Sequence, residues 1–309
     1  EPGAPRLVPV GGPRDVHLGD ILILPTTVAG YSKKVGLRLD EPGGETGTVQ
    51  RSPRRERDWQ QRVETFEAHV REAVACFDTI VGQVEREGWG LARLAAYLET
   101  EETRLRELVK VAIVGHDLGK LNREWQRMAW EALETWARDP TNLAQLGDEQ
   151  RAILEAHPRP FLARFPGEAR RLPLHATVSA YILGPWLVER YGEVCGGAAA
   201  LAMAHHHHVR ARDIPEYRMA RGWVEAVTEL LRELAGVEMP QGHLEEQGIQ
   251  RSRTTLLAQG LPSIPEFQRK QTYTCYVVVA RCLSLADRIA AGGGTERAVL
   301  DYEEWVGNL

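Results

Sequence analysis

LRELVKVAIVGHDLGKLN, residues 105–122, joins an apolar run to a His, an Asp, a Gly and a Lys. The apolar run predicts a buried helix over 101–116. An Asp at the end of a core helix, Asp117 here, is unfavourable unless its carboxylate is paired or binds a metal. We expect Gly119 to let the chain turn away from the helix end, and Lys120 to present a cation to a phosphate oxygen. The stretch therefore predicts a core helix that ends in metal-binding chemistry.

Most of the sequence after Asp58 has the apolar spacing of amphipathic helices. Asp58 is the expected N-cap of a helix over 59–87. Breaks that contain Gly or Pro separate the further helices, which are expected at 91–98, 101–116, 122–138, 173–191, 197–208, 214–236, 242–258 and 266–291. We therefore predict an all-α helical bundle over residues 58–309.

The first 57 residues have a different pattern. GDILILPTTVAGYS at 19–32 has a β-type apolar run bounded by Gly and Pro, and VGLRLDE at 35–41 alternates apolar and polar residues. These stretches predict a small β-hairpin followed by a flexible linker. Residues 1–57 are therefore expected to form a short β-segment and linker ahead of the helical domain.

Composition narrows the class of protein. The chain of 309 residues is 43% hydrophobic and 26% charged, which is ordinary for a globular protein. It contains no apolar run of about 18 residues, so no membrane helix is expected. Four cysteines without a CxxC pair, and no signal-peptide pattern at the start, predict reduced thiols and a cytoplasmic location. A net charge of −5 gives no general argument for nucleic-acid binding, although RSPRRER at 51–57 is locally basic.

Side chains that ligate metals recur along the predicted helices. They are His69, His116, Asp117, His175, the run His205 to His208, and Asp287. Most have an ordinary alternative: a core histidine at 69, a helix start at 175, a helix end favoured by the macrodipole at the four-histidine run, or an ion pair between Asp287 and Arg288. Together they are more specific, because imidazoles and carboxylates bind divalent first-row metals and one Asp carboxylate can bridge two of them. The set predicts a metal-dependent hydrolase.

The order of these residues resembles the HD phosphohydrolase superfamily. Over roughly 58–291 the chain looks most like the HD nuclease domain of the type I CRISPR helicase–nuclease. HDLGKLNREWQ at 116–126 is similar to that family's HDxGKxxxxFQ signature, with Trp125 in the Phe position. LADRIA at 285–290 is similar to its terminal aDrxa motif.

Two further segments carry the resemblance. LHATVSA at 174–180 is similar to the family's HExxS segment, with Ala176 in place of the acidic residue. AHHHHVR at 204–210 is similar to AHHGxVR, with a His in the Gly position. Because four histidines are consecutive, the ligand pair has three possible registers: His205–His206, His206–His207 or His207–His208.

The resemblance implies a role for each matching residue. The first metal would be held by His69, His116, Asp117 and Asp287. The second would be held by Asp117, His175, His205 and His206, so that Asp117 bridges the two. Lys120 would contact the scissile phosphate, and Arg210 and Arg212 would bind flanking phosphates unless they are simply an exposed helix end. The implied cofactors are two divalent ions of Mn, Fe, Ni, Co or Zn, with Mg the less suited ion.

The function that the resemblance implies is metal-dependent cleavage of single-stranded DNA in CRISPR interference. The expected partners are single-stranded DNA, the CRISPR helicase and the crRNA-guided surveillance complex, with no membrane. The segment 19–36 also resembles the connector of type I-U (I-G) proteins, which would make the chain the C-terminal nuclease of a larger helicase–nuclease. Two alternatives stay open: an HD-type nucleotide phosphohydrolase, and a non-catalytic HD module that docks a partner.

Overall fold

The computed structural model shows a short β-hairpin followed by a helical domain. It describes residues 30–32, 36–38, 62–86, 91–166, 172–207, 213–214, 217–239, 249–250, 254–255 and 270–292. The chain divides into two compact units, Glu1–Trp59 and Gln60–Leu309. In the first unit, β1 (Gly30–Ser32) pairs antiparallel with β2 (Gly36–Arg38). The predicted small N-terminal β-segment is therefore confirmed.

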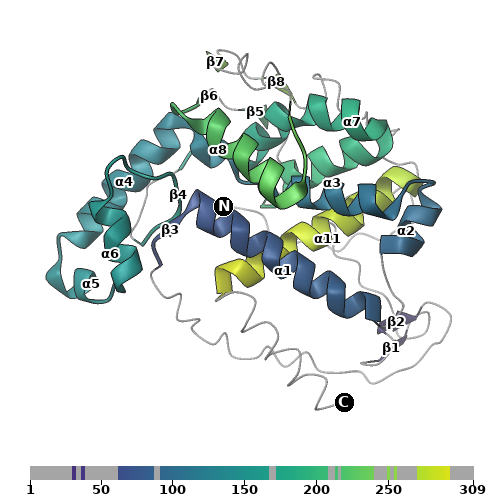
Figure 1. Cartoon of the computed structure of the whole chain (residues 1–309), viewed down its shortest axis with the longest axis horizontal. Coiled ribbons are helices and arrows are strands. Elements are labelled where there is room, and N and C mark those ends of the chain that lie inside the picture. The colour runs from purple at the N-terminus through teal and green to yellow at the C-terminus, as the bar shows by residue number, and fades with distance from the viewer. Residues whose placement is uncertain are drawn as a thin grey trace, which may run out of the picture. The chain divides into compact units, whose positions relative to one another are not determined.

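The second unit is built from helices (Figure 1). Those with described bounds are α1 (Phe66–Arg86), α2 (Leu91–Tyr97), α3 (Glu102–Gly115), α4 (Arg123–Ala137), α5 (Pro140–Ala144), α6 (Asp148–Glu155), α7 (Ala176–His205), α8 (Trp223–Leu230) and α11 (Lys270–Gly292). A 3-10 helix, η2 (Leu118–Leu121), follows α3, and a π-helical turn, η3 (Leu231–Ala235), extends α8. The prediction of an all-α bundle is confirmed.

Helix α3 lies in the middle of the domain. It packs against α1, α2, α7 and α11, and α7 in turn packs along α11 (Figure 1). Every residue of α3 from Val111 to Gly115 is buried, because neighbouring helices cover it on several sides. The helix therefore delivers the two residues that follow it, His116 and Asp117, directly into the core.

The predicted start of the first helix is wrong by several residues. Helix α1 begins at Phe66, because Glu64 and Thr65 form a short strand, β3, that pairs with β4 (Leu162–Arg164). The Thr65 hydroxyl then caps the helix by accepting a hydrogen bond from the Ala68 backbone N–H at 3.1 Å. Asp58, the expected N-cap, lies outside the described residues.

Helices α4, α5 and α6 lie beside the β3–β4 pair (Figure 1). A second small core lies there, built mainly on α4. Its buried side chains are Val63, Trp125, Ala129, Trp130, Leu133, Leu146 and Leu162. No helix is predicted from the sequence over α5 and α6. The start of α5 nevertheless has a recognisable sequence signal, because Asp139 accepts a hydrogen bond from the Thr141 backbone N–H at 2.8 Å and Pro140 occupies the first helical position.

Two predicted helix boundaries differ from those in the structure, one within α7 and one after it. The helices expected at 173–191 and 197–208 run together as α7, with a break at Gly192, whose φ of 81° interrupts the helical backbone. The helix expected from 214 begins only at Trp223. Ahead of it, β5 (Asp213–Ile214) and β6 (Tyr217–Arg218) are short strands.

These strands also overturn part of the helix predicted over 242–258. Strand β5 pairs with β8 (Thr254–Thr255), and β6 pairs with β7 (Ile249–Gln250), both antiparallel. Pairing with a distant partner overrides the local helical spacing. The remaining residues of that predicted helix lie outside the described part of the chain. No helix in the described ranges combines the length and apolar character that crossing a bilayer requires.

Candidate metal centre

The predicted ligand residues converge on Asp117, which follows the central helix α3. Helix α1 contributes His69, the C-cap of α3 is His116, the N-cap of α7 is His175, and α11 contributes Asp287. The end of α7 brings His206 and His207 to the same place. Segments far apart in the sequence therefore meet at one carboxylate because α1, α7 and α11 all pack around α3.

The two oxygens of Asp117 face different histidines. Oδ2 lies 3.4 Å from Nε2 of His69 and 3.4 Å from Nε2 of His116. Oδ1 lies 3.1 Å from Nε2 of His175 and 3.6 Å from Nε2 of His206. The carboxylate therefore stands between two groups of imidazoles.

Two sets of ligand atoms are each close enough to hold an ion. One set is His69, His116 and Asp117, and the other is Asp117, His175, His206 and His207. The ligand atoms of each set lie within 4.8 Å of one another. Asp287 lies on the side of the first set, with Oδ1 3.3 Å from Nε2 of His69 and 3.8 Å from Nε2 of His116.

The donor chemistry fits divalent first-row metals. Nε2 of His69, His116, His175 and His206 and Oδ1 of Asp117 are buried without a hydrogen-bond partner among the described residues. Buried polar atoms are nearly always satisfied, so several unsatisfied donors and acceptors around one point need an explanation. Neutral imidazoles and carboxylates are good ligands for these metals, so the residues present match such ions.

Two of the histidines are oriented by their own helices. Nδ1 of His116 lies 2.6 Å from the backbone oxygen of Ile113, and Nδ1 of His206 lies 2.6 Å from that of Met203. An Nδ1–H that donates to a carbonyl leaves Nε2 as the ring atom with a free lone pair. In both histidines Nε2 is also the atom that faces Asp117.

The charges of the first group are shifted by burial and by one another. Burial opposes a positive charge on His69, but contacts with three carboxylates outweigh it and raise the pKa to about 10. Burial also opposes the charge of Asp117, yet His116, Lys120 and the other imidazoles hold its pKa well below the ordinary value. The carboxyl of Asp287 is likewise buried, and its contacts with His116 and His69 lower its pKa. In the first group, the protonated His69 therefore faces the carboxylates of Asp117 and Asp287.

In the second group, burial shifts the pKa values of two histidines downward. Burial lowers the pKa of His175 to about 4, although its contact with Asp117 opposes that shift. Burial and the neighbouring His206 lower the pKa of His207 to about 3. His175 and His207 are therefore neutral near pH 7, which is the form that binds a metal.

The family comparison agrees with this geometry. The family model described as "Cas3, HD domain" matches residues 54–292. The chain belongs to the Cas3 HD domain family. This confirms the resemblance to the HD nuclease domain, and it makes the chain an HD-type metal-dependent hydrolase with the His–Asp groups as its candidate metal site. None of the curated proteins matches the chain.

Lys120 of this Cas3 HD domain contacts the central carboxylate. Its Nζ donates a hydrogen bond to Oδ2 of Asp117 at 2.6 Å, and it lies 5.8 Å from the centre of the Trp125 ring. The lysine is largely buried, with 8% of its surface exposed. Its ammonium therefore sits at the metal cluster, where it balances part of the charge of Asp117.

Gly119 has a different role from the expected one. Its φ is not positive, so the turn after α3 does not require a glycine. A Cβ at this position would instead clash with the backbone carbonyl of His175. The Gly119 N–H also donates to the Ser179 hydroxyl at 2.8 Å, and that hydroxyl donates to the His175 carbonyl at 3.0 Å. Gly119 therefore allows η2 to press against the start of α7, which carries His175.

Among the consecutive histidines that the structure describes, two lie near Asp117. His206 and His207 join the group around Asp117, whereas the ring of His205 lies 6.2 Å from that of Tyr276 on α11 and belongs to neither group. The expected pair His205–His206 is therefore not the pair that the structure brings together. His208, Arg210 and Arg212 lie outside the described residues.

Sequence reasoning missed Glu64 and Arg164. Oε2 of Glu64 lies 3.4 Å from Nδ1 of His69, and the Arg164 guanidinium lies 3.1 Å from Oδ1 of Asp287. Glu64 stands directly opposite Arg164 in the β3–β4 pair. The only local signal was an acidic residue five positions before His69, in a segment predicted to be helical.

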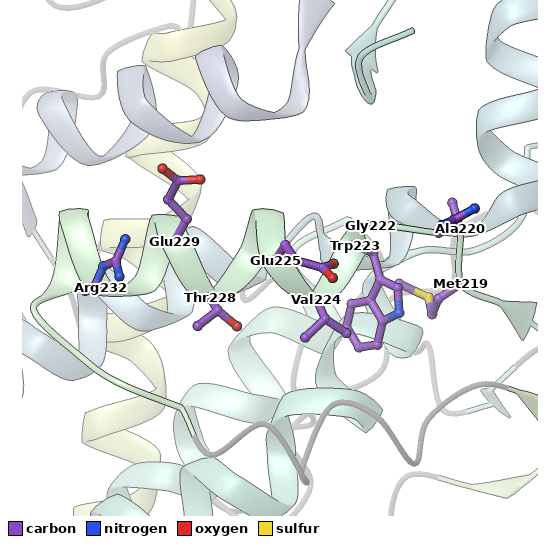
Figure 2. Close-up of a pocket in the computed structure, with 10 residues that line it drawn as sticks. Met219, Ala220, Gly222, Trp223, Val224, Glu225, Thr228, Glu229 and Arg232 are labelled. Atoms are coloured by element: carbon purple, nitrogen blue, oxygen red, sulfur yellow. The ribbon is translucent and has the colours of Figure 1, made fainter. Parts of the chain in front are cut away.

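A separate pocket of about 580 Å³ lies along α8 (Figure 2). Its lining includes Trp223, Glu225, Thr228, Glu229 and Arg232, and none of the ligand residues of the metal cluster lines it. The pocket and the cluster are therefore different places on this Cas3 HD domain.

Proposed function

We propose that this chain is a nuclease that hydrolyses phosphodiester bonds of single-stranded DNA in CRISPR interference, using two divalent ions that share Asp117. The observation that carries the proposal is the placement of Asp117 between two groups of imidazoles, one at each carboxylate oxygen. One carboxylate that faces two ligand sets is the arrangement that a bridged pair of ions requires.

The ligand sets follow from the geometry around the two oxygens. The first ion would be held by His69, His116, Asp117 and Asp287. The second would be held by Asp117, His175, His206 and His207. Sets this rich in imidazole suit Mn, Fe, Co, Ni or Zn, whereas Mg prefers oxygen ligands and water. We therefore expect transition-metal ions in both positions.

The chain's own residues would prepare the site for phosphate chemistry. Bound divalent ions would supply Lewis-acid stabilisation of a phosphodiester and an activated water. Asp117 and the imidazoles would fix the ligand geometry, because their helices are packed rigidly into the core. Lys120 would direct its ammonium from Asp117 to a phosphate oxygen, where negative charge develops in the transition state.

Single-stranded DNA is the favoured substrate because the centre is recessed. The side chains of His69, His116 and Asp117 are at most 1% exposed, and His207 is the one ligand of either set that is exposed. A flexible single strand can enter such a site more easily than a duplex backbone. The proposal therefore includes a CRISPR helicase and a crRNA-guided complex as partners that provide the strand. It also keeps Arg210 and Arg212, on their sequence position alone, as candidates for binding flanking phosphates.

The proposal is tested by cleavage of circular single-stranded DNA, which has no ends and is not a nucleotide. We expect wild-type protein to cut circles with Mn²⁺ and to stop when EDTA is added. Asp117→Asn should lower the rate by at least about 100-fold, because it removes the bridging charge. Asp148→Asn is the matched control, since Asp148 is exposed in the first turn of α6, and it should cut like the wild type.

Other outcomes would favour the alternatives. A protein that binds Mn²⁺ and hydrolyses nucleotides, but cuts neither circular nor linear single-stranded DNA, would be a nucleotide phosphohydrolase. A protein that binds no metal would be a docking module. Cleavage of linear strands alone would show that the nuclease needs a free end.

A further inference from the structure

We propose that Glu64 is a positioning residue for the first ion. Its carboxylate holds the His69 ring in place from one side, while the carboxylates of Asp117 and Asp287 face the ring from the other. The inference rests on the proposed function, since it assumes an ion at His69, His116, Asp117 and Asp287. Arg164 completes the arrangement by contacting both Glu64 and Asp287.

The His69 ring has a carboxylate at each of its two nitrogens. On one edge, Nδ1 lies 3.4 Å from Oε2 of Glu64. On the other edge, Nε2 lies 3.4 Å from Oδ2 of Asp117 and 3.3 Å from Oδ1 of Asp287. These separations are slightly longer than an ordinary N–H···O bond, so a small movement of the ring suffices to form one. Glu64 and His69 are both buried, so bulk water does not solvate this contact.

His69 differs from His116 and His206 in the group that contacts its Nδ1, the ring nitrogen that faces away from Asp117. Nδ1 of His116 and Nδ1 of His206 each face a backbone carbonyl within the same helix. Nδ1 of His69 instead faces a side-chain carboxylate from a strand that precedes its helix. A carboxylate partner fixes the ring and makes the metal-binding nitrogen more basic than a carbonyl partner does. Glu64 is therefore placed to strengthen the first set of ligands selectively.

The surroundings of Glu64 explain how its charge is tolerated in the core. Nε of Arg164 lies 3.5 Å from Oε2 of Glu64, and the Arg62 guanidinium lies 3.7 Å from Oε1. A buried carboxylate needs such partners to offset the loss of hydration. Because the same Arg164 also reaches Oδ1 of Asp287 at 3.1 Å, one cation fixes both the outer carboxylate and a ligand carboxylate. The β3–β4 pairing sets this spacing, since it places Glu64 opposite Arg164.

The test is a titration of metal-free protein with Mn²⁺. The electron paramagnetic resonance signal of free Mn²⁺ measures how much of the metal is bound. We expect two sites in the wild type. Glu64→Ala should weaken one site about 10- to 100-fold, the range found when outer-shell partners of metal ligands are removed. Glu64→Gln keeps an oxygen acceptor at the same reach and should lose less. Glu67→Gln is the matched control, because the Glu67 side chain is 65% exposed and should leave both affinities unchanged.

A second variant identifies which site has changed. His207→Ala should weaken the other site, so that the losses from Glu64→Ala and His207→Ala affect different steps of the binding curve. Wild-type affinities in Glu64→Ala would overturn the inference. So would an equal loss at both sites together with a lower metal-free melting temperature, since that pattern indicates a purely structural residue. Absence of Mn²⁺ binding by the wild type would instead overturn the proposed function, and the inference with it.

Discussion

Asp117 keeps a negative charge in the core because polar groups surround both of its oxygens. Lys120 donates to Oδ2 at 2.6 Å, and imidazoles approach each oxygen within 3.6 Å. A buried charge is stable only with such compensation, and removing one partner leaves the rest uncompensated. Single residues next to Asp117 are therefore expected to affect both stability and metal binding.

Gly119→Ala is expected to be destabilising, because the added Cβ would meet the backbone of His175 rather than a movable side chain. Overpacking of this kind typically costs about 1–3 kcal/mol in the free energy of unfolding. It should also weaken the metal site that contains His175, since the start of α7 must move. Urea unfolding of metal-free protein and Mn²⁺ titration measure the two effects.

The control for this substitution is Gly147→Ala, where a Cβ would meet no atom within 4 Å. Gly147 is the N-cap of α6. Because exchanging an N-cap residue typically changes stability by about 1 kcal/mol, the free energy of unfolding of Gly147→Ala should stay within that range of the wild type. Equal losses in both variants would show that the close approach of Gly119 to His175 is not the cause.

At the level of secondary-structure elements, Gln126 joins three of them. From α4 its Nε2 donates to the Lys120 carbonyl in η2 at 2.9 Å and to the Leu162 carbonyl in β4 at 2.8 Å. Its Oε1 accepts from the Leu162 N–H at 2.9 Å. The side chain therefore connects the loop that carries Asp117 and Lys120 to the strand that carries Arg164.

Gln126→Ala should leave buried backbone groups of Lys120 and Leu162 unsatisfied. Each unsatisfied buried group costs about 1–3 kcal/mol, so a loss of at least this size in the free energy of unfolding is expected. Cleavage of single-stranded DNA should fall as well, because η2 loses its contact with β4. Gln145→Ala, at an exposed position after α5, should change neither quantity. A Gln126→Ala protein with wild-type stability would contradict the role given to these hydrogen bonds.

At the scale of the whole molecule, the metal cluster connects helices that are distant in the sequence. The candidate ligands lie in α1 and α11 and next to the ends of α3 and α7, so an ion bound there would stabilise the packed state relative to the unfolded chain. The pKa of His69, raised to about 10, adds a pH dependence. At neutral pH this histidine carries a proton that a metal must displace, so metal affinity should rise as the pH rises toward 10.

We therefore expect Mn²⁺ to raise the melting temperature, and to raise it more at pH 8 than at pH 6. A concentration about 100 times the dissociation constant stabilises by about 2.7 kcal/mol. For a domain of this size that corresponds to about 5–10 °C. Differential scanning fluorimetry with and without EDTA measures the shift at each pH. A shift that is equal at both pH values would contradict displacement of a proton from His69.

The sequence by itself determined the class of fold and pointed to most of the candidate ligand residues. Apolar spacing predicts α3 and α4 nearly to their ends, because a helix that buries one face repeats locally. Most candidate ligands were recognisable because each lies in a short motif and the motifs follow one another in a known order. The structure brings these side chains together, namely His116, Asp117, His175 and Asp287.

Only the tertiary structure decided which histidines lie near Asp117 and which carboxylate contacts Nδ1 of His69. Four consecutive histidines have the same local pattern in every register, whereas in the described part of the chain the structure brings His206 and His207 close to Asp117. Glu64 reaches His69 because β3 pairs with β4, which lies about a hundred residues further along the chain. Helical periodicity depends on residues a few positions apart and can be recognised locally. These contacts depend on how segments distant in the sequence pack together.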